Sequence, residues 1–225
     1  MEVLLGLLIF AIIAATIYSV LSGGIKLSRV SEGRVAVYRE ASWAVSLFAR
    51  ELENMARYDV TGMEDVEPLF QGEKDEITFL LPTNDGLKYI RYSLLAPTSG
   101  KIHQVVLGQR TDKNVDIQLT DTVAERSYFL VREEYEIHEA LTGDASGAIP
   151  EIIAGNIKAD SLRFEYAYAD NESGDKIRYE EEWGQNEIPS KIRMTLKLID
   201  EYNHDTVSLT RDVLIPHGVL GQSEI

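Results

Sequence analysis

The sequence contains no cysteine and only four histidines among its 225 residues. Without cysteine the chain can form no disulfide, no thiolate zinc site and no cysteine nucleophile. The histidines, His103, His138, His204 and His217, stand apart, so no H-E-x-x-H pattern and no pair one helical turn apart occurs. A phosphate-binding glycine motif is also missing. We therefore expect no catalytic activity from this chain.

Positive charge is scarce as well. The chain has 22 Lys and Arg residues against 37 Asp and Glu residues, a formal net charge of −15. Nucleic-acid binding needs clustered Lys and Arg, so the acidic balance predicts no nucleic-acid partner. The same balance disfavours broad adhesion of the chain to anionic lipid headgroups. The length is that of one domain with an appendage.

A long apolar run is present at the start of the chain. It extends from Val3 to Leu21 and is long enough to cross the hydrocarbon core of a bilayer, which takes about 20 residues. Gly23 and Gly24 follow and could loosen the helix, and Lys26 then marks the polar boundary. The residues predicted to form the membrane helix are Val3, Leu4, Leu5, Leu7, Leu8, Ile9, Phe10, Ile12 and Ile13.

Two simpler interpretations of this run were weighed. A cleaved signal peptide needs basic residues before the run and an A-x-A-like cleavage site after it. No Lys or Arg precedes the run, and Tyr18-Ser19-Val20-Leu21 fits such a site poorly. An ordinary signal anchor is the second alternative. Read alone, the cations Lys26, Arg29, Arg34 and Arg39 after the run would keep the body in the cytoplasm. Neither alternative explains Glu2, an acid at the edge of the apolar run.

An acid followed by a Leu/Ile/Ala-rich run and an amphipathic helix resembles the type IV pilins and type II secretion pseudopilins. In that family a basic leader ends in Gly, and Phe-Thr-Leu-(Leu/Ile)-Glu follows. Met1-Glu2-Val3-Leu4-Leu5 aligns with the end of this motif, which places Glu2 on the family's glutamate. The resemblance implies that the native protein begins upstream with such a leader. A cytoplasmic leader would place the body outside the cytoplasm.

The next segment predicts a second, amphipathic half of the same helix. From Ile25 to about Tyr58 the apolar residues recur every three or four positions and no proline interrupts them. We expect residues 1–25 in the membrane or filament core, residues 26–58 as the amphipathic half, and residues 59–225 as a strand-rich globular domain. The predicted packing face consists of Val30, Val37, Ala41, Phe48, Leu52 and Met55.

The remainder of the chain alternates short apolar runs with turn residues, which indicates antiparallel strands. Loops are predicted at Asp59–Gly72 and Thr142–Gly155, a hairpin turn at Asn84-Asp85-Gly86, and a frayed end from Gly218 to Ile225. The predicted strands are Ile77–Leu81, Leu87–Leu95, His103–Leu107, Tyr128–Ile137, Leu162–Tyr168, Ile177–Trp183, Ile192–Ile199 and Val207–Ile215. The fold class expected is α+β, with the long helix packed on an antiparallel sheet in a pilin-like arrangement.

The order of several short blocks resembles the J class of type II secretion minor pseudopilins. The helix end and first strands carry Arg50-Glu51-Leu52-Glu53, Phe70-Gln71-Gly72 before Ile77-Thr78-Phe79-Leu80, and Leu87-Lys88-Tyr89-Ile90-Arg91-Tyr92-Ser93-Leu94. The last third carries Leu162-Arg163-Phe164-Glu165-Tyr166, Trp183, Ile188-Pro189-Ser190-Lys191-Ile192-Arg193-Met194-Thr195-Leu196 and Arg211-Asp212-Val213-Leu214-Ile215-Pro216.

This resemblance implies a non-catalytic assembly role. A J-class subunit is processed by a prepilin peptidase and N-methylated. It sits in the inner membrane with its body in the periplasm, and contacts the inner-membrane secretion platform. It packs beside the I and K classes, with the H class as a further neighbour, in the tip complex that initiates the pseudopilus. Glu2 would pair with the free N-terminal amine of a neighbouring subunit. The alternatives are a type IV pilus minor pilin and a membrane-anchored extracytoplasmic binding module.

No cofactor is expected, and calcium is the one metal weighed. Asp170 and Asp175 lie in a turn rich in oxygen ligands, and Asp112 and Asp116 lie in another. Calcium takes six to eight oxygens, and neither turn has the EF-hand spacing. A solvated polar turn is the interpretation that we favour for both.

Overall fold

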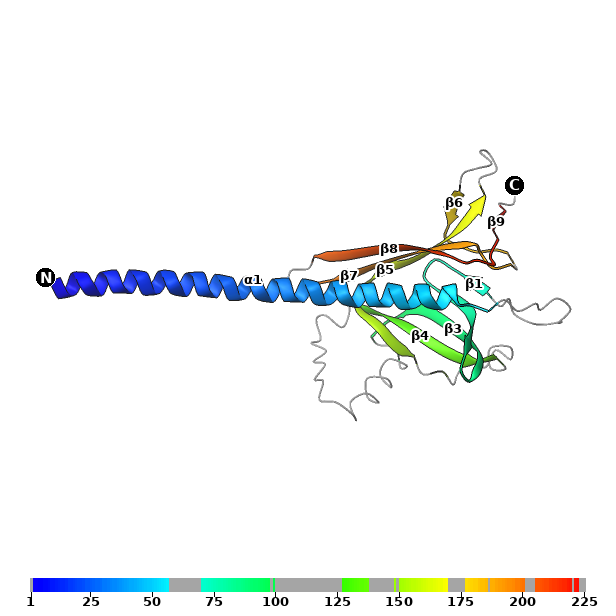
Figure 1. The fold of residues 1–225 in the computed structure, drawn as a ribbon, viewed down its shortest axis with the longest axis horizontal. Helices are drawn as coiled ribbons and strands as arrows, with labels where there is room; N and C mark the ends of the chain where they lie inside the picture. The colour runs from blue at the N-terminus through cyan, green and yellow to red at the C-terminus, as the bar shows by residue number, and fades with distance from the viewer. Residues whose placement is uncertain are drawn as a thin grey trace.

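The computed structural model describes residues 2–56, 70–97, 99, 127–137, 148, 150–169, 177–185, 187–200, 205–219 and 221–222. Within these ranges the fold is α+β, with one long amino-terminal helix and a curled antiparallel sheet (Figure 1). The elements are α1 (Glu2–Glu53), β1 (Phe70–Gly72), β2 (Ile77–Thr83), β3 (Gly86–Leu95), β4 (Tyr128–Glu136), β5 (Glu151–Ala169), β6 (Ile177–Glu180), β7 (Lys191–Ile199), β8 (Thr206–Leu214) and β9 (Gly221–Gln222).

The helix α1 is continuous over 52 residues. No proline interrupts it, and the predicted weak point at Gly23 and Gly24 remains helical. It ends at Glu53, before the predicted end near Tyr58. At this end Asn54 caps the last turn, because its Nδ2 donates a hydrogen bond to the Arg50 carbonyl at 2.6 Å. The Ala56 amide then donates to the Leu80 carbonyl at 2.8 Å, so the chain passes directly from the helix to the sheet.

The strands follow the order β1-β2-β3-β4-β5-β7-β8, and β6 and β9 also pair with β5. Every pairing is antiparallel except that of β9 with β5. Asn84 and Asp85 form the predicted two-residue hairpin between β2 and β3, and Gly86 follows with φ of 120°. That prediction is confirmed. Because Gly has no Cβ, it adopts this backbone conformation without steric cost.

The strand β5 joins the two parts of the curled sheet, which are β1 to β4 on one side and β7 and β8 on the other. Its first residues pair with β4, and the stretch from Leu162 onward pairs with β7. Between them the register shifts, and Asn156 and Asp160 have φ of 53° and 58°. Such irregularities bend a strand and allow the sheet to change direction.

The predicted loop Thr142–Gly155 was therefore wrong for residues 151–155, which belong to β5. Small residues that are typical of loops serve a bulged strand here. The predicted loop Asp59–Gly72 was wrong at its end, because residues 70–72 form β1 and pair with β2. The predicted frayed end was wrong in part, since Gly221–Gln222 pairs with β5. The predicted strand His103–Leu107 lies outside the described residues.

The core lies between the second half of α1 and the concave side of the sheet (Figure 1). The helix supplies residues from Ala41 to Leu52, and all the central strands supply the rest. Burial of these apolar side chains is the main favourable term for the body. The strand residues of the core include Ile77, Phe79, Ile90, Tyr92, Leu130, Ile157, Leu162, Phe164, Tyr166, Met194 and Leu196.

Candidate functional site

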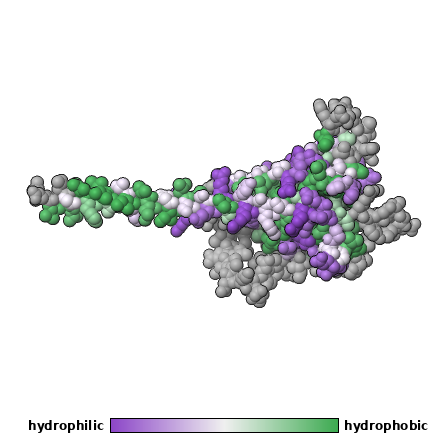
Figure 2. Space-filling model, in the orientation of Figure 1, coloured by the Kyte–Doolittle hydropathy of each residue, from purple (hydrophilic) through white to green (hydrophobic). Residues whose placement is uncertain are grey.

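The first half of α1 projects from the body and exposes its apolar side chains (Figure 2). Val3 is 80% exposed and Phe10 is 71% exposed. This helix is long and apolar enough to cross a membrane. The other exposed members of the predicted membrane helix are Leu7, Leu8, Ile9, Ile12 and Ile13. Glu2, Leu4 and Leu5 lie in the helical backbone, and their side chains are outside the described part of the structure.

The second half of α1 sits on the sheet through one face. Ala41, Phe48 and Leu52 are fully buried, and Val37 and Met55 are partly buried against the same core. Val30 is half-buried and lies before the helix reaches the body. The structure thus brings five of the six predicted packing residues into one core, and the sixth marks the approach to it. We call the contact between α1 residues 37–55 and the sheet the helix seat.

Aromatic rings fill the centre of the helix seat. The Phe48 ring lies edge-on to Tyr92, with centroids 5.3 Å apart and planes at 85°. It also packs on Phe164 at 5.2 Å. Tyr92 belongs to β3 and Phe164 to β5, so one helical side chain contacts both parts of the curled sheet. Edge-to-face aromatic pairs add to area burial, which makes Phe48 a central residue of the seat.

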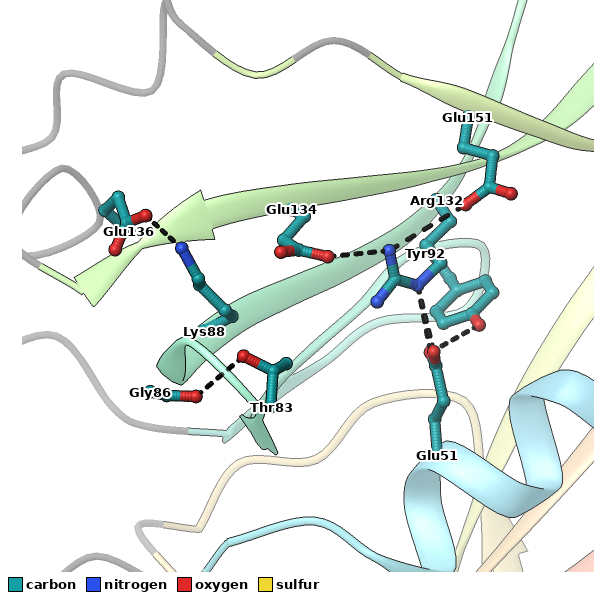
Figure 3. Close-up of polar contacts among 9 residues, drawn as sticks. All are labelled: Glu51, Thr83, Gly86, Lys88, Tyr92, Arg132, Glu134, Glu136 and Glu151. Carbon is teal, nitrogen blue, oxygen red and sulfur yellow. Dashed lines mark hydrogen bonds and ion pairs between the residues drawn. The ribbon is translucent and has the colours of Figure 1, made fainter.

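A buried polar triad fixes the end of the helix seat (Figure 3). Glu51 faces the sheet, and its carboxylate accepts a hydrogen bond from the Tyr92 hydroxyl at 2.6 Å. Arg132 of β4 donates from Nε to the same carboxylate at 3.0 Å. The guanidinium also pairs with Glu134 through Nη1 at 3.0 Å. Each of the three side chains therefore has at least one hydrogen-bond partner, as buried polar groups require.

Burial and charge alter the ionisation of Tyr92 and Arg132 in this triad. Burial and the Glu51 carboxylate raise the pKa of Tyr92 far above its ordinary value. Burial lowers the pKa of Arg132, but the hydrogen bond and the charge of Glu51 outweigh it and the net change is upward. Tyr92 thus stays neutral and Arg132 stays charged throughout the physiological range. The arrangement is suited to holding the end of α1 and the sheet in register.

A second polar contact holds α1 near the start of the helix seat. The Glu40 carboxylate accepts a hydrogen bond from the Gly155 amide at 2.7 Å. Gly155 lies in the irregular part of β5, beside Asn156. Because a bulged strand leaves backbone donors without a ladder partner, a helical carboxylate can satisfy one of them. This contact links the bend of the sheet to one position along the helix.

A charged cluster lies on the outer side of the sheet. The Asp212 carboxylate of β8 accepts a hydrogen bond from Arg193 Nε at 2.7 Å and pairs with Lys191 at 2.6 Å, both of β7. The Arg193 guanidinium stacks over the Tyr179 ring at 3.9 Å. The hydrogen bond from Arg193 and the charge of Lys191 lower the pKa of Asp212 to about 2. The cluster ties β6, β7 and β8 together.

Metal-ligating side chains do not gather in the part of the chain that the structure describes. No group of three or more His, Asp or Glu residues that could hold an ion is found there. Asp170 and Asp175, the calcium candidates, lie outside the described residues, and so do Asp112 and Asp116. The acidic run at Glu180 and Glu181 is used in surface pairs with Arg178 and Arg163.

The triad of Glu51, Tyr92 and Arg132 was not found from the sequence. A signal was present, because Glu51 falls three residues after Phe48 and next to Leu52, on the predicted packing face. Its partner could not be named, since Arg132 lies 81 residues away and alternation alone gives no register between strands.

The comparisons with known proteins give no family for this chain. No family model, curated protein or solved structure matches it.

Proposed function

We propose that this chain is a membrane-anchored, non-catalytic assembly subunit, and specifically a J-class minor pseudopilin of a type II secretion machine. The observation that carries the proposal is the construction of α1. One unbroken helix of 52 residues has an exposed apolar first half and a second half seated on a strand-rich body. A helix of this kind can leave a bilayer and enter a helical bundle without refolding of the body.

The order of the sequence blocks is the basis for proposing the J class in particular. Glu51, in the block at the helix end, is buried in the helix seat. The blocks of the last third supply Phe164, Ile192 and Met194 to the core. These residues lie in the core of the body, and this supports the proposal. The pilin-like arrangement, the I-class and K-class partners, the H-class neighbour and the secretion platform are proposed on the resemblance.

Glu2 is the residue proposed to drive assembly. It begins α1, directly before the apolar run. An unpaired carboxylate in hydrocarbon is costly, and a cationic partner offsets that cost. If Glu2 pairs with the free amine of a neighbouring subunit, only the unassembled chain carries the free-energy cost of an unpaired carboxylate. Assembly would then be favoured and the axial register of neighbouring helices would be fixed.

The first experiment tests whether the chain is cleaved by a prepilin peptidase and N-methylated, as the proposed family implies. The natural reading frame is expressed with and without a prepilin peptidase, and the intact mass of the product is measured. We expect loss of a basic leader and a methylated N-terminus a few residues before Glu2. An unprocessed product, or cleavage after the apolar run near Gly23, would contradict the proposal.

The second experiment tests the role of Glu2 with a matched control on the same helix. Glu2→Ala and Glu53→Ala each remove one acid, and Glu53 is exposed at the far end of α1. Each variant is co-expressed with the I-class and K-class subunits and recovered by affinity purification from detergent. We expect Glu2→Ala to reduce recovery of the partners and Glu53→Ala to leave it unchanged. Equal recovery for both variants would overturn the assembly role of Glu2.

Two rivals remain distinct from this proposal. A type IV pilus minor pilin would carry the same anchor, and co-purification with pilus subunits in place of the secretion subunits would favour it. An anchored extracytoplasmic binding module would use α1 only as a tether. In that case replacing residues 2–25 with an unrelated membrane helix would leave its activity intact, whereas it would abolish assembly of a pseudopilin.

A further inference from the structure

The segment of α1 directly after the apolar run differs in charge from the rest of the molecule. Residues 26 to 50 contain five Lys and Arg residues and only two acids, Glu32 and Glu40, although the whole chain has 37 acids and 22 cations. The net charge of the chain therefore hides a local basic segment. We call its first four cations, Lys26, Arg29, Arg34 and Arg39, the basic collar.

All four side chains of the basic collar are exposed on the surface of α1. Lys26, Arg29 and Arg34 lie between the apolar run and the helix seat, and Arg39 lies at the start of the seat. None of the four forms an ion pair within the described residues. Glu40 instead accepts from the Gly155 amide, and Glu32 accepts from the Ser28 hydroxyl. The cations thus have charge available for an external partner.

The geometry of the helix points to a membrane surface as that partner. Each residue rises about 1.5 Å, so Arg29 lies about 5 Å, Arg34 about 12 Å and Arg39 about 20 Å beyond Lys26. Lys26 itself stands where the apolar run ends, which is the level of the headgroups if the run fills the hydrocarbon core. At about 100° per residue the four cations point in four directions around the axis. Lys26 and Arg29, the two cations nearest the apolar run, lie about 60° apart around the axis, and a bilayer surrounds a helix on all sides, so both can reach the same headgroup layer.

We propose that the basic collar binds anionic phospholipid headgroups and fixes the depth of α1 in the bilayer. Lys26 and Arg29 would contact the lipid phosphates directly. Arg34 and Arg39 both lie beyond one Debye length, which is about 8 Å at physiological ionic strength. The contribution of each cation therefore falls with its distance from the apolar run. This inference rests on the membrane anchoring that the proposed function also requires.

The test measures lipid selectivity of the full chain reconstituted in phosphatidylcholine vesicles. Spin-labelled phosphatidylglycerol and spin-labelled phosphatidylcholine are compared, and their relative association with the protein is obtained by electron paramagnetic resonance. We expect a preference for phosphatidylglycerol of about threefold or more, because each cation near a membrane surface attracts anionic lipid. The preference should shrink at an ionic strength of about 1 M, where screening is strong.

Matched variants separate the collar from total charge. Lys26→Gln/Arg29→Gln/Arg34→Gln should lose the preference. The control Lys158→Gln/Lys197→Gln/Arg211→Gln makes the same charge change at exposed positions on the body and should keep it. Among single changes, Lys26→Gln and Arg29→Gln should act more strongly than Arg39→Gln.

Three results would overturn the collar. In the first, the wild-type chain inserts into the vesicles but associates equally with both lipids. In the second, the triple collar variant keeps the preference for phosphatidylglycerol. The third is a lack of lipid preference combined with weaker recovery of partner subunits by the collar variant, which would assign the collar to an acidic protein surface. These results leave the anchor of the proposed function standing. Failure of the wild-type chain to enter vesicles would instead overturn the anchor and the collar together.

Discussion

Glu51 shows how much a single acid can contribute on the buried face of a helix. Its side chain and that of Arg132 are each only 11% exposed, and Tyr92 completes the set. A buried pair of this kind gains little over apolar residues of the same shape. Removal of one partner is different, because it leaves the other charged and desolvated. The triad therefore selects one rotation of α1 on the sheet more than it adds stability.

Glu51→Ala should destabilise the body by about 3 kcal/mol, because Arg132 would stay buried without its carboxylate. The free energy of unfolding is measured by urea titration of the full chain in detergent. Glu53→Ala is the control on the exposed side of the same turn and should change it by less than about 0.5 kcal/mol. The double variant Glu51→Leu/Arg132→Met should recover much of the loss. A Glu51→Ala variant as stable as the control would contradict the role of the triad.

Asp212 should make the body sensitive to acid. The Arg193 hydrogen bond lowers the pKa of Asp212 to about 2 from 3.8. A lowered folded-state pKa gives stability that is complete above the unfolded value and is lost as the pH falls from about 4 to about 2. The side chain is 33% exposed, so solvent screening limits the contribution to about 1 kcal/mol.

The variant Asp212→Asn checks this directly. Its unfolding free energy should lie below that of the wild type at pH 6, and the difference should shrink steadily below pH 4. Urea titrations at pH 6, 4, 3 and 2 give the two curves. A difference that stays constant with pH would mean that the charge of Asp212 is not the cause.

At the scale of the element, β1 depends on one residue without a side chain. Gly72 pairs with Ile77 of β2 and bridges to Trp183, and a Cβ added to it would lie 2.4 Å from the Tyr166 ring. Tyr166 is fully buried and its hydroxyl donates to the Glu73 carbonyl at 3.0 Å, so the ring has little room to move. This strand can pack on the ring only because the side chain is absent.

Gly72→Ala should therefore destabilise the body by about 1–3 kcal/mol through overpacking. Gly184→Ala is the matched control, because no atom lies within 4 Å of its added Cβ. Thermal unfolding of both variants, followed by circular dichroism, measures the difference. Equal melting temperatures would show that Tyr166 moves aside at no cost.

At the scale of the whole molecule, the anchor and the body are built from separate residues. The buried core begins at Ala41, whereas the apolar run ends at Leu21. A chain without residues 1–25 should therefore stay in solution without detergent and unfold at the same urea concentration as the full chain. Sedimentation of both forms, with and without detergent, checks the first point. A shortened chain that aggregates or unfolds earlier would show that the apolar half also supports the body.

The sequence predicted the elements with a regular period and missed those without one. The length of the apolar run predicted the first half of α1, and three- and four-residue spacing predicted the second half. Alternation predicted β7 and β8 to within one residue. The first part of β5 was missed because its bend needs Gly155, Asn156 and Asp160, which are also typical loop residues. The partners of Glu51 were missed for another reason, since strand register is a long-range property.

The curl of the sheet along the helix also has a mechanical consequence. Strands β7 and β8 run beside α1 and contact it, so the helix seat is extended along the helix axis (Figure 1). A pull on the amino-terminal end would load Phe48, Leu52 and the Glu51 pair at the same time, in shear. A pull across the helix would open the same contacts one after another, at lower force, a difference that single-molecule extension from the two attachment points would measure. The body is therefore strongest in the direction in which a membrane helix would be drawn out of a bilayer.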